Sequence, residues 1–332
     1  MSLPPVVIPL GAMRFNSDSQ KLEYFNGQIW LQIHTFSPNL DGGARGVFSG
    51  GHTPTRVNTI DYITIPTAGN AIDFGDITVA RSASGSVGSR TRGLQAGGSE
   101  PGNSDVIDYW TFSSTGNAVD FGNLVGAVHW NQPTSSATRG VWAQGNNPGN
   151  SNIIQYVTMA SSGNAVDFGD MSYGASVTAN SSNQSPTRGF FGGGTPTTTN
   201  VIEYITTATL GNSQDFGDST THVAREARGS SSTRALLIGG TRAEPSSATI
   251  IDYFTMSSLG NAVQFGDASA SIKNSAGCSD SIRVAFAFGE APSNVDTIEY
   301  VNISTGGDAV DFGNLSVARN HLSGCSNGHG GL

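Results

Sequence analysis

The sequence predicts an all-β fold of the β-propeller type, preceded by a short β-meander. The first observation is a fixed repeat, since a Tyr and a Phe 12 residues apart return six times in the 332 residues, with successive Tyr residues 47, 47, 48, 49 and 47 positions apart. A period of this size is typical of solenoids and propellers. The second is composition: 44 glycines and only 12% charged residues suit short strands and many turns rather than helices.

Charge and hydropathy exclude several functional classes. The formal net charge is -9, and the 16 Lys and Arg residues form no basic block, so nucleic acid is not an expected partner. The first ten residues have no basic residue before their apolar part and are interrupted by Pro, so they do not resemble a signal peptide. No apolar run approaches the length that spans a bilayer, and we expect no membrane insertion.

The leader, residues 1–44, has the pattern of a three-stranded meander followed by a linker. Asn26-Gly27 between two apolar segments predicts a two-residue hairpin turn, and residues 16–19 predict another turn. So small a sheet is marginally stable alone, so we expect it to dock, either on its own repeat domain or on copies of itself or a neighbouring protein. The side chains expected to make an attachment or oligomerisation contact are Phe15, Tyr24, Phe25 and Trp30.

The repeat domain, residues 45–332, divides into six units near 45–91, 92–138, 139–187, 188–233, 234–282 and 283–332. Each unit contains an Arg-Gly strand ending in small residues, an Ile-Asp-Tyr strand, a Gly-Asn pair and an Asp-Phe-Gly strand, and then a segment rich in Ser, Ala and Gly. We interpret Gly-Asn as the tight turn of an outer hairpin. The small residues suit the crowded innermost strand of a propeller blade.

Spacing at the two ends of the repeats predicts how the ring closes. In most units 18 residues separate the Phe from the next Arg, and counting 18 on from Phe312 reaches Gly330, near the last residue of the sequence. Residues 321–328 therefore have no following Arg-Gly strand, and the first Arg-Gly strand has no preceding inner strand. We expect the two to pair, giving six blades closed by the C-terminal strand without an open edge at the seam.

Two stretches carry a resemblance to known families. The Gly pair, the Tyr, the later aromatic residue and Val79-Ala80-Arg81 resemble a kelch repeat, although Phe stands where kelch has Trp and the Arg becomes Val128 or Ala175 in other units. Residues 11–16 with 21–30 look like a short β module of structural and fibre proteins of tailed bacteriophages, and the Gly-Asn-Ala-Val-Asp-Phe-Gly signature is similar to repeats of cyanophage proteins. The resemblance implies a six-bladed kelch-like β-propeller in a virion structural protein.

Repeated charges and scattered reactive residues are interpreted as scaffold. Each unit carries one Arg before Gly or a small residue, and most carry an acid before Tyr and before Phe, so we expect Arg-carboxylate pairs that link strands. Cys278 and Cys325 fall at matching places in successive units and are expected to be small buried core residues rather than a disulfide. The six His residues lack metal-ligand spacing, and no nucleophile elbow or phosphate loop is present. We expect no catalysis, metal or cofactor.

Candidate binding residues lie where the units differ, because propeller loops gather at the faces. His129 and Trp130 follow the Phe strand of one unit, Tyr173 follows that of the next, and Arg56 and Arg242 lie in variable segments after Gly pairs. Exposed aromatic rings among Asn, Gln and Ser suit stacking on sugar rings. The alternative is that these side chains pack between blades.

The expected function is that of a phage virion structural protein, made in the host cytoplasm and displayed on the particle as a fibre or other appendage. Its propeller would adhere, without catalysis, to a glycan or protein of the host surface, while the leader would contact other virion proteins or further copies of the chain. One alternative is a purely structural capsid decoration or connector, and another is a glycan-degrading enzyme on a propeller scaffold.

Overall fold

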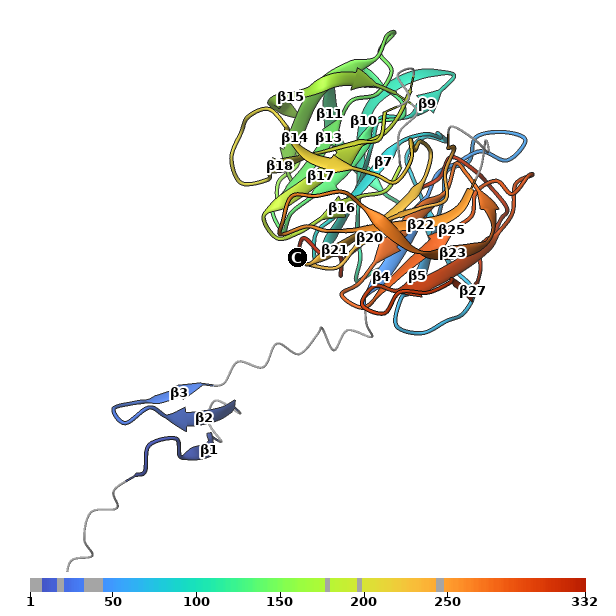
Figure 1. Ribbon diagram of the computed structural model, residues 1–332. Helices are drawn as coiled ribbons and strands as arrows, with labels where there is room; N and C mark the ends of the chain where they lie inside the picture. The colour runs from blue at the N-terminus through green and yellow to red at the C-terminus, as the bar shows by residue number, and fades with distance from the viewer. Residues whose placement is uncertain (1–7, 17–20, 33–43, 177–179, 196–198, 243–247) are drawn as a thin grey trace, which may run out of the picture. The chain divides into compact units, whose positions relative to one another are not determined.

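The chain consists of two units built from β-strands (Figure 1). The computed structural model describes residues 8–16, 21–32, 44–176, 180–195, 199–242 and 248–332. The units are Met1–Leu40 and Asp41–Leu332. Regular structure in the described ranges is all strand, in seven antiparallel sheets, which confirms the predicted all-β class. None of these residues belongs to a helix long and apolar enough to cross a membrane.

The N-terminal unit contains the predicted meander. Its strands β1 (Met13–Asn16), β2 (Lys21–Phe25) and β3 (Trp30–Gln32) pair in the order β1-β2-β3. The β2–β3 connection takes four residues rather than the predicted two, because the Asn26 side-chain oxygen accepts hydrogen bonds from the N–H groups of Gln28 and Ile29, at 3.0 and 2.8 Å. The turn predicted at 16–19 lies outside the described residues from position 17 on.

The repeat unit contains six sheets, each ordered as inner strand, Arg-Gly strand, Tyr strand and Phe strand. The first sheet is β28 (Ser323–Ser326), β4 (Arg45–Ser49), β5 (Thr59–Thr64) and β6 (Ile72–Asp76); the second is β7 (Gly85–Gly88), β8 (Arg92–Ala96), β10 (Gly102–Thr111) and β11 (Val119–Val128), with β9 (Ser99–Glu100) beside β10; the third is β12 (Gln132–Ser135), β13 (Arg139–Ala143), β14 (Ser151–Thr158) and β15 (Val166–Ala175). The fourth is β16 (Asn183–Gln184), β17 (Arg188–Gly192), β18 (Val201–Thr206) and β19 (Gln214–Asp218); the fifth is β20 (Ala227–Ser230), β21 (Arg234–Ile238), β22 (Ala248–Thr255) and β23 (Val263–Ile272); the sixth is β24 (Ala276–Ser279), β25 (Arg283–Ala287), β26 (Thr297–Asn302) and β27 (Val310–Asn314).

The inner strands lie beside one another. Contacts join β28 to β7, β7 to β12, β12 to β16, β16 to β20, β20 to β24 and β24 to β28. The first sheet takes its inner strand from the far end of the repeats, since Ser323 pairs with Ser49 and Ser326 with Gly46. The pairing expected for the C-terminal segment is therefore present. Small four-stranded sheets in this arrangement are consistent with a β-propeller.

The constant Tyr-to-Phe spacing reflects a bulge in every outer hairpin. In the first sheet Ile60 faces Gly75 and Asp61 faces Asp73, which leaves Phe74 without a partner in the ladder. The same register shift occurs in the other five sheets. The unpaired Phe is buried and meets the Tyr of its own sheet edge-on, with ring centroids 5.7 to 6.0 Å apart in all six. This geometry is favourable for aromatic pairs.

The Gly-Asn pair joins neighbouring sheets rather than forming the tight turn predicted for it. Gly69 donates its N–H to the Phe312 carbonyl of the sixth sheet at 2.7 Å, and the Asn70 side-chain oxygen accepts the N–H of Asn314 at 3.1 Å. The same two bonds recur between all consecutive sheets, with Asp308 in the place of Asn in the sixth unit. We call this contact the clasp.

The clasp also explains the Gly of Asp-Phe-Gly. Gly75 has a φ of 143°, which an L side chain rarely adopts, and a Cβ there would lie 2.5 Å from the backbone of Gly116 in the next sheet. The equivalent glycines of the other units face the same obstruction from the following Gly-Asn pair. The glycine therefore allows two backbones to approach closely.

The six repeated Arg residues do not pair with carboxylates, which corrects the sequence prediction. Each guanidinium carbon lies 4.5 to 4.9 Å from the ring centre of the Tyr in its own sheet. Each guanidinium also donates to a backbone carbonyl of the next sheet, as Arg45 does to Phe112 at 2.6 Å. A cation is attracted to the negative face of an aromatic ring. These Arg residues therefore join sheets through rings and carbonyls.

The acids that precede Tyr do join sheets, but with other partners. Asp61 accepts from the N–H of Ser316 at 3.2 Å and pairs with Arg319 at 2.8 Å, both on the connection from the sixth sheet. Asp108 pairs in the same way with Thr78 and Arg81. A prediction based on opposite charge therefore identified the acids as links between strands and assigned them the wrong arginines. The two cysteines are free and buried, as expected.

Candidate binding surface

His129 and Trp130 lie just before inner strand β12 and take part in one cluster. The two rings are 4.9 Å apart, and the Trp130 ring lies 5.8 Å from His321 of the last connection. The guanidinium of Arg225, which precedes β20, lies 5.6 Å from the centre of the Trp130 ring. All four side chains are partly exposed. We call His129, Trp130, Arg225 and His321 the aromatic–basic cluster.

Three of these residues occupy equivalent backbone positions. Trp130, Arg225 and His321 each stand nine residues after the Phe of their unit, as do Ala83 and Asn274. All five have positive φ, between 50° and 62°. The equivalent position of the third unit lies outside the described residues. The left-handed turn therefore recurs at all five of these positions that the structure describes, although it is unfavourable for residues other than Gly.

Backbone hydrogen bonds hold these turns together. Trp130 donates its N–H to Ala83 at 2.6 Å, Ala83 to His321 at 2.9 Å, and His321 to Asn274 at 3.0 Å, each time to the carbonyl. The bonds connect four different sheets at the start of their inner strands. A set of contacts between backbones fixes the turns, so side chains of unrelated chemistry can occupy them.

The charge of Arg225 is not compensated by a partner. The acid whose charge acts on it is Glu290, and this carboxylate already contacts the Lys273 ammonium at 3.2 Å and accepts from Asn274 at 2.8 Å. Within the described part of the chain, the Arg225 guanidinium makes no hydrogen bond or ion pair, and its recorded contact is the ring of Trp130. The cluster therefore holds a half-buried positive charge.

Both histidines of the cluster favour their neutral form. Burial, followed by the charge of Arg225, lowers the pKa of His321 to about 4. Burial and then Arg56 lower the pKa of His129. The Nδ1 atom of His129 lies 2.7 Å from the side-chain oxygen of Asn103, whose amide nitrogen donates to a carbonyl, so Nδ1 carries the proton.

The other predicted binding residues divide into one neighbour of the cluster and two that lie elsewhere. Arg56 is exposed and donates to the Ser99 hydroxyl at 3.0 Å. Tyr173 directs its hydroxyl at the Gly193 carbonyl, 3.3 Å away, and burial raises its pKa, so it packs within the scaffold. The described contacts do not bring it to the cluster.

Arg242 is a structural residue, which corrects its prediction as a ligand-binding residue. Its side chain is only 3% exposed and pairs with Asp252 at 2.9 Å. Arg81 and Arg319, each seven residues after the Phe of the preceding unit, pair with the matching acids of the second and first sheets. For the fifth sheet the equivalent position is Val223 of the fourth unit. Arg242 supplies the missing guanidinium from a loop of its own sheet.

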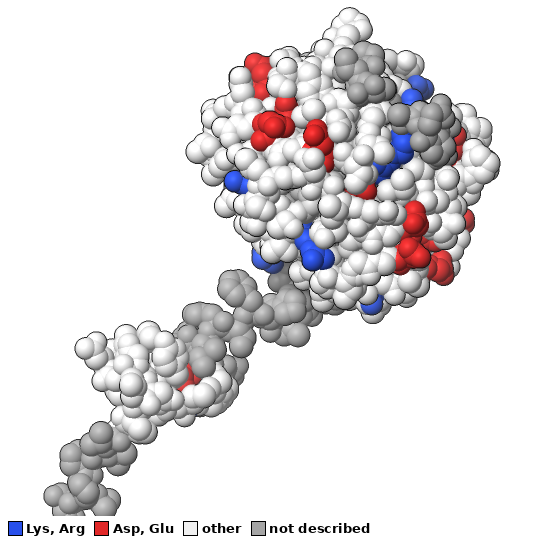
Figure 2. Space-filling view, viewed as in Figure 1, with Lys and Arg blue, Asp and Glu red and all other residues white. Residues whose placement is uncertain are grey.

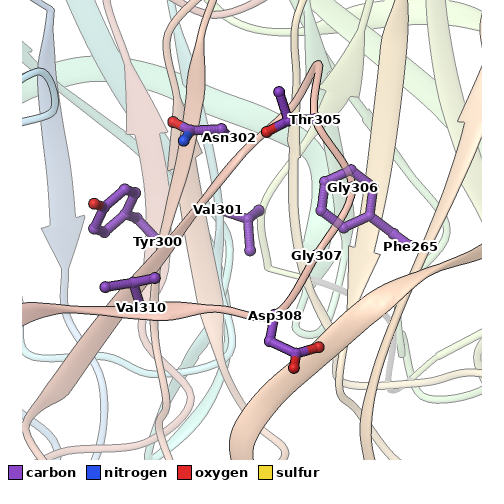
Figure 3. Close-up of a pocket in the computed structure, with 9 residues that line it drawn as sticks. All are labelled: Phe265, Tyr300, Val301, Asn302, Thr305, Gly306, Gly307, Asp308 and Val310. Carbon is purple, nitrogen blue, oxygen red and sulfur yellow. The ribbon is translucent and has the colours of Figure 1, made fainter.

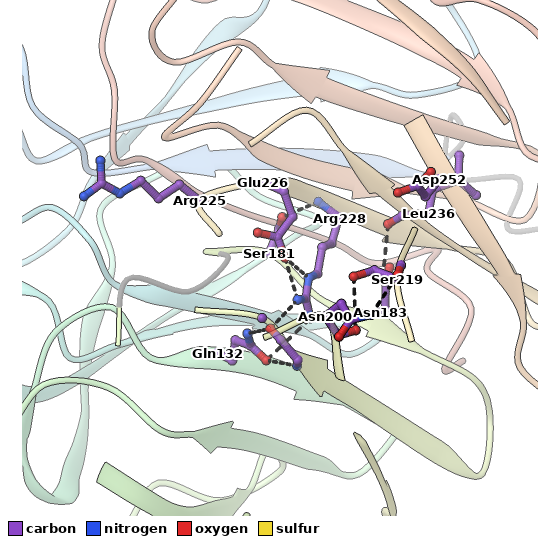
Figure 4. A network of polar contacts seen from close by, with 12 residues as sticks. Gln132, Ser181, Asn183, Asn200, Ser219, Arg225, Glu226, Arg228, Leu236 and Asp252 are labelled. Carbon is purple, nitrogen blue, oxygen red and sulfur yellow. Dashed lines mark hydrogen bonds and ion pairs between the residues drawn. The ribbon is translucent and has the colours of Figure 1, made fainter. Parts of the chain in front are cut away.

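A second polar network lies buried among the inner strands (Figure 4). Arg228 of β20 donates to Glu226 at 2.7 Å and to the Gly192 carbonyl of the fourth sheet at 2.8 Å, while Gly192 donates to Gln132 of the third sheet at 2.8 Å. In Figure 4 Arg225 points away from this network. The buried pair therefore belongs to the scaffold and leaves Arg225 to the surface cluster.

Residues 329–332 pack against the ends of the inner strands that lie away from the aromatic–basic cluster. The Nε2 atom of His329 donates to the Gly88 carbonyl at 2.6 Å and lies 3.2 Å from the Ser135 hydroxyl, and Gly330 donates to Ser230 at 3.0 Å. Burial lowers the pKa of His329 to about 4. The segment thus contacts the ends of three inner strands from inside the fold.

Shallow hollows at the outer hairpins are part of the repeated scaffold. One lies between Tyr300, Asp308 and Val310 of the sixth unit and Phe265 of the fifth (Figure 3). Another is lined by the matching residues around Tyr204. Because they recur at the clasps, they do not distinguish one unit as a site. Figure 2 shows acidic residues singly and in small groups over the visible face, and a few spread basic residues that form no large basic block.

The N-terminal sheet has two different faces. Met13 pairs with Tyr24 and Phe15 with Leu22, and directly opposite residues share a face. All four side chains are exposed, Phe15 to 66%. On the opposite face Phe25 and Trp30 pack together, with ring centres 5.4 Å apart, and the Arg14 guanidinium covers Trp30 at 4.2 Å. Of the predicted attachment residues, Phe15 and Tyr24 therefore lie on the apolar face and Phe25 and Trp30 do not.

Sequence comparison adds no family assignment. No protein-family model matches the chain, and no curated protein matches it. Among the described residues, no three His, Cys, Asp or Glu side chains gather as they would around a metal ion. Arg225, Asn274 and His321 were missed by sequence reasoning. Their signal was a fixed offset after Phe at which residue type varies, and it becomes meaningful only when the turns are seen side by side.

Proposed function

We propose that residues 45–332 form a closed six-bladed kelch-like β-propeller. The six repeated sheets, the contacts between consecutive inner strands and the pairing of β28 with β4 support this assignment. The clasp from Gly69 to Phe312 repeats, at the seam, the contact that joins every other pair of sheets. In such a ring the aromatic–basic cluster lies at one mouth of the central axis and His329 lies near the other.

The propeller serves non-catalytic adhesion to a glycan or protein of a host surface. The observation that carries this proposal is the aromatic–basic cluster, where equivalent positions around the axis hold Trp130, Arg225 and His321 instead of one repeated residue. Polar groups that do repeat, such as the acids before Tyr, are engaged with neighbouring sheets. Side chains that the scaffold does not use, gathered at a partly exposed site, are suited to binding.

The biological setting is the particle of a tailed phage, as an appendage protein. The support for this setting is the resemblance of residues 11–30 to phage β modules and of the repeat signature to phage repeats. The apolar face of the N-terminal sheet supports an attachment role, since Met13, Phe15, Leu22 and Tyr24 are exposed on a sheet too small to be stable alone. Other virion proteins, or further copies of the chain, would cover it.

A purely structural role is the second candidate, and the same apolar face favours it. A connector would use this face together with the propeller faces to contact other virion proteins, without a ligand. The two candidates differ in what the aromatic–basic cluster does. In a connector, removing the Trp130 ring would leave assembly unchanged unless a partner protein covers the cluster.

Binding of the purified full chain to a glycan array and to cells of susceptible hosts tests the proposal. Adhesion should be present in the wild type and reduced at least about tenfold by Trp130→Ala, because aromatic anchors dominate small binding sites. Phe15→Asp, on the N-terminal sheet, should leave binding by each chain intact and affect self-association or assembly. Absence of binding to every glycan and cell, with assembly retained, would favour the connector.

A further inference from the structure

The geometry points to the aromatic–basic cluster as a binding site for a carboxylate-bearing sugar residue, with Arg225 as the residue that recognises the carboxylate. This inference rests on the proposed adhesion function and narrows it from glycans in general to acidic ones. It rests on two groups that form no ion pair or hydrogen bond with the described scaffold: the Arg225 guanidinium and the Asn274 side-chain oxygen.

The fold does not require the side chains that make up the site. Ala83 occupies the turn equivalent to those of Trp130, Arg225 and His321, with a φ of 57°, and it makes the same backbone hydrogen bonds as Trp130 and His321. A methyl group is therefore enough for the turn. Three large side chains at the equivalent positions add nothing that the backbone of the turn needs. Their role is best sought in what they bind.

Arg225 provides the charge. Its guanidinium is half-buried beside an aromatic ring and lacks an anionic partner, while Glu290 is already engaged by Lys273 and Asn274. A guanidinium presents parallel N–H donors that match the two oxygens of a carboxylate. The protein carries a net charge of -9, so long-range attraction does not bring anions to it, and recognition depends on this local contact.

Trp130 and Asn274 provide contacts for the rest of a sugar. The Trp130 ring is partly exposed beside the neutral rings of His129 and His321, which offers an amphipathic surface for the carbon-bound face of a pyranose. The side-chain oxygen of Asn274, at the equivalent turn before β24, is buried and has no hydrogen-bond partner among the described residues. An unsatisfied buried acceptor is costly, and a sugar hydroxyl would satisfy it.

Calorimetry with a matched pair of probes tests the inference on the full chain. Trigalacturonic acid carries carboxylates, and its methyl ester has the same sugar rings without the charge. The wild type should bind the acid more tightly than the ester. Arg225→Gln should weaken binding of the acid about 10-fold to 100-fold, since a hydrogen bond to a charged group contributes about 1.5–3 kcal/mol, and should leave binding of the ester unchanged.

Two variants separate this site from general electrostatics and from the broader function. Arg90→Gln removes the same charge from an exposed residue at the other end of an inner strand, and it should bind the acid as the wild type does. Trp130→Ala should weaken the binding of both probes.

Equal binding of acid and ester by the wild type, with both lost in Trp130→Ala, would overturn the acidic-sugar inference while supporting adhesion. An equal loss with Arg90→Gln and Arg225→Gln would show a diffuse charge effect and overturn the assigned site. Inorganic phosphate that displaces the acid at equal concentration would also overturn recognition of a carboxylate sugar, in favour of a general oxyanion site.

Discussion

The clasp and the left-handed turn that carries most of the aromatic–basic cluster both recur around the repeat unit, yet they follow opposite rules. In the clasp the side chains hardly change, since Gly, Asn and the bulged Phe return in every unit except that Asp308 replaces Asn in the sixth. At the turn only the backbone recurs, and the side chain changes from Ala83 to Trp130, Arg225, Asn274 or His321.

The difference shows what repetition in a sequence reports. A residue repeats where its side chain, or the absence of one, is needed for the contact between sheets, and it varies where the backbone of any residue can make that contact. A signature such as Gly-Asn-Ala-Val-Asp-Phe-Gly therefore marks the scaffold. The positions proposed here to bind a ligand share a conformation without sharing a side chain, and their positive φ rather than their residue type identifies them in the structure.

The largest loss of stability is expected when the ion pair of Arg319, two residues before His321 of the cluster, is broken. Arg319 is fully buried and pairs with Asp61, whereas His321 points into the cluster. Arg319→Met should lower the free energy of unfolding by about 3–5 kcal/mol, because a buried carboxylate loses its counterion. Urea denaturation followed by fluorescence measures the loss.

The control for that prediction lies on the same connection. His321→Ala should change the free energy of unfolding by less than about 1 kcal/mol, since the turn already accepts Ala83 in the second sheet. Adding Asp61→Asn to Arg319→Met should recover part of the stability. Equal losses for Arg319→Met and His321→Ala would mean that the cluster is as much a part of the scaffold as the ion pair.

The next largest loss of stability is expected from substituting one of the two glycines of a clasp, with the other as control. Gly122 has a φ of 147°, and a Cβ there would lie 2.5 Å from the carbonyl oxygen of Gly163, whereas a Cβ on Gly163 would meet no atom within 4 Å. Gly122→Ala should cost about 2–3 kcal/mol from strain and crowding, and Gly163→Ala less than about 1 kcal/mol. Thermal unfolding of the two variants would contradict the clasp geometry if their losses were equal.

The histidine at the far end of the inner strands tests whether that end belongs to the scaffold. Burial lowers the pKa of His329 to about 4, against an ordinary value of about 6.5. The unfolded chain therefore takes up a proton that the folded chain refuses, so stability is complete above about pH 6.5 and falls as the pH drops towards 4. By linkage the loss from this residue is about 2 kcal/mol at pH 5.

Comparing wild type with His329→Gln isolates that loss. The variant should lose less stability than the wild type between pH 7 and pH 5, whatever its stability at pH 7. Identical pH dependence of the two proteins would show that His329 is protonated freely in the fold and that the last residues do not seal this end.

More of the scaffold than of the candidate site could be predicted from the sequence, for a physical reason. Periodicity revealed the strands, the outer hairpins, the N-terminal meander and the pairing of the last segment with the first Arg-Gly strand, because these depend on residues close in sequence or on the count of repeats. The partner of Gly69 could not be predicted, since it is a backbone carbonyl of Phe312 at the opposite end of the repeats.

The charged residues show the same limit. Opposite charge suggested carboxylate partners for Arg45 and its equivalents, but a Tyr ring and a carbonyl satisfy them, and the acids are satisfied by Arg81, Arg319 and Arg242. Trp130 and Tyr173 were selected because they depart from the pattern of their repeats, and His129 because it is the neighbour of Trp130. Arg225 also departs from the pattern of its repeat, but an isolated Arg in a linker does not show from the sequence that it lies near Trp130. Only the structure brings their turns together.

The smallest expected loss of stability, that of Arg225→Gln, gives the most direct comparison between the cluster and the scaffold. Arg225→Gln should change the free energy of unfolding by less than about 0.5 kcal/mol, because the guanidinium makes no ion pair in the described structure and loses only its contact with the Trp130 ring. The matched measurement is Arg45→Gln, which removes a cation from a Tyr face together with its bond to the Phe112 carbonyl and should cost about 1–2 kcal/mol. Both arginines lie over aromatic rings, so the difference isolates the contact between sheets. A stable Arg225→Gln protein that has lost binding would place Arg225 in function alone, whereas a loss of stability equal to that of Arg45→Gln would place it in the scaffold.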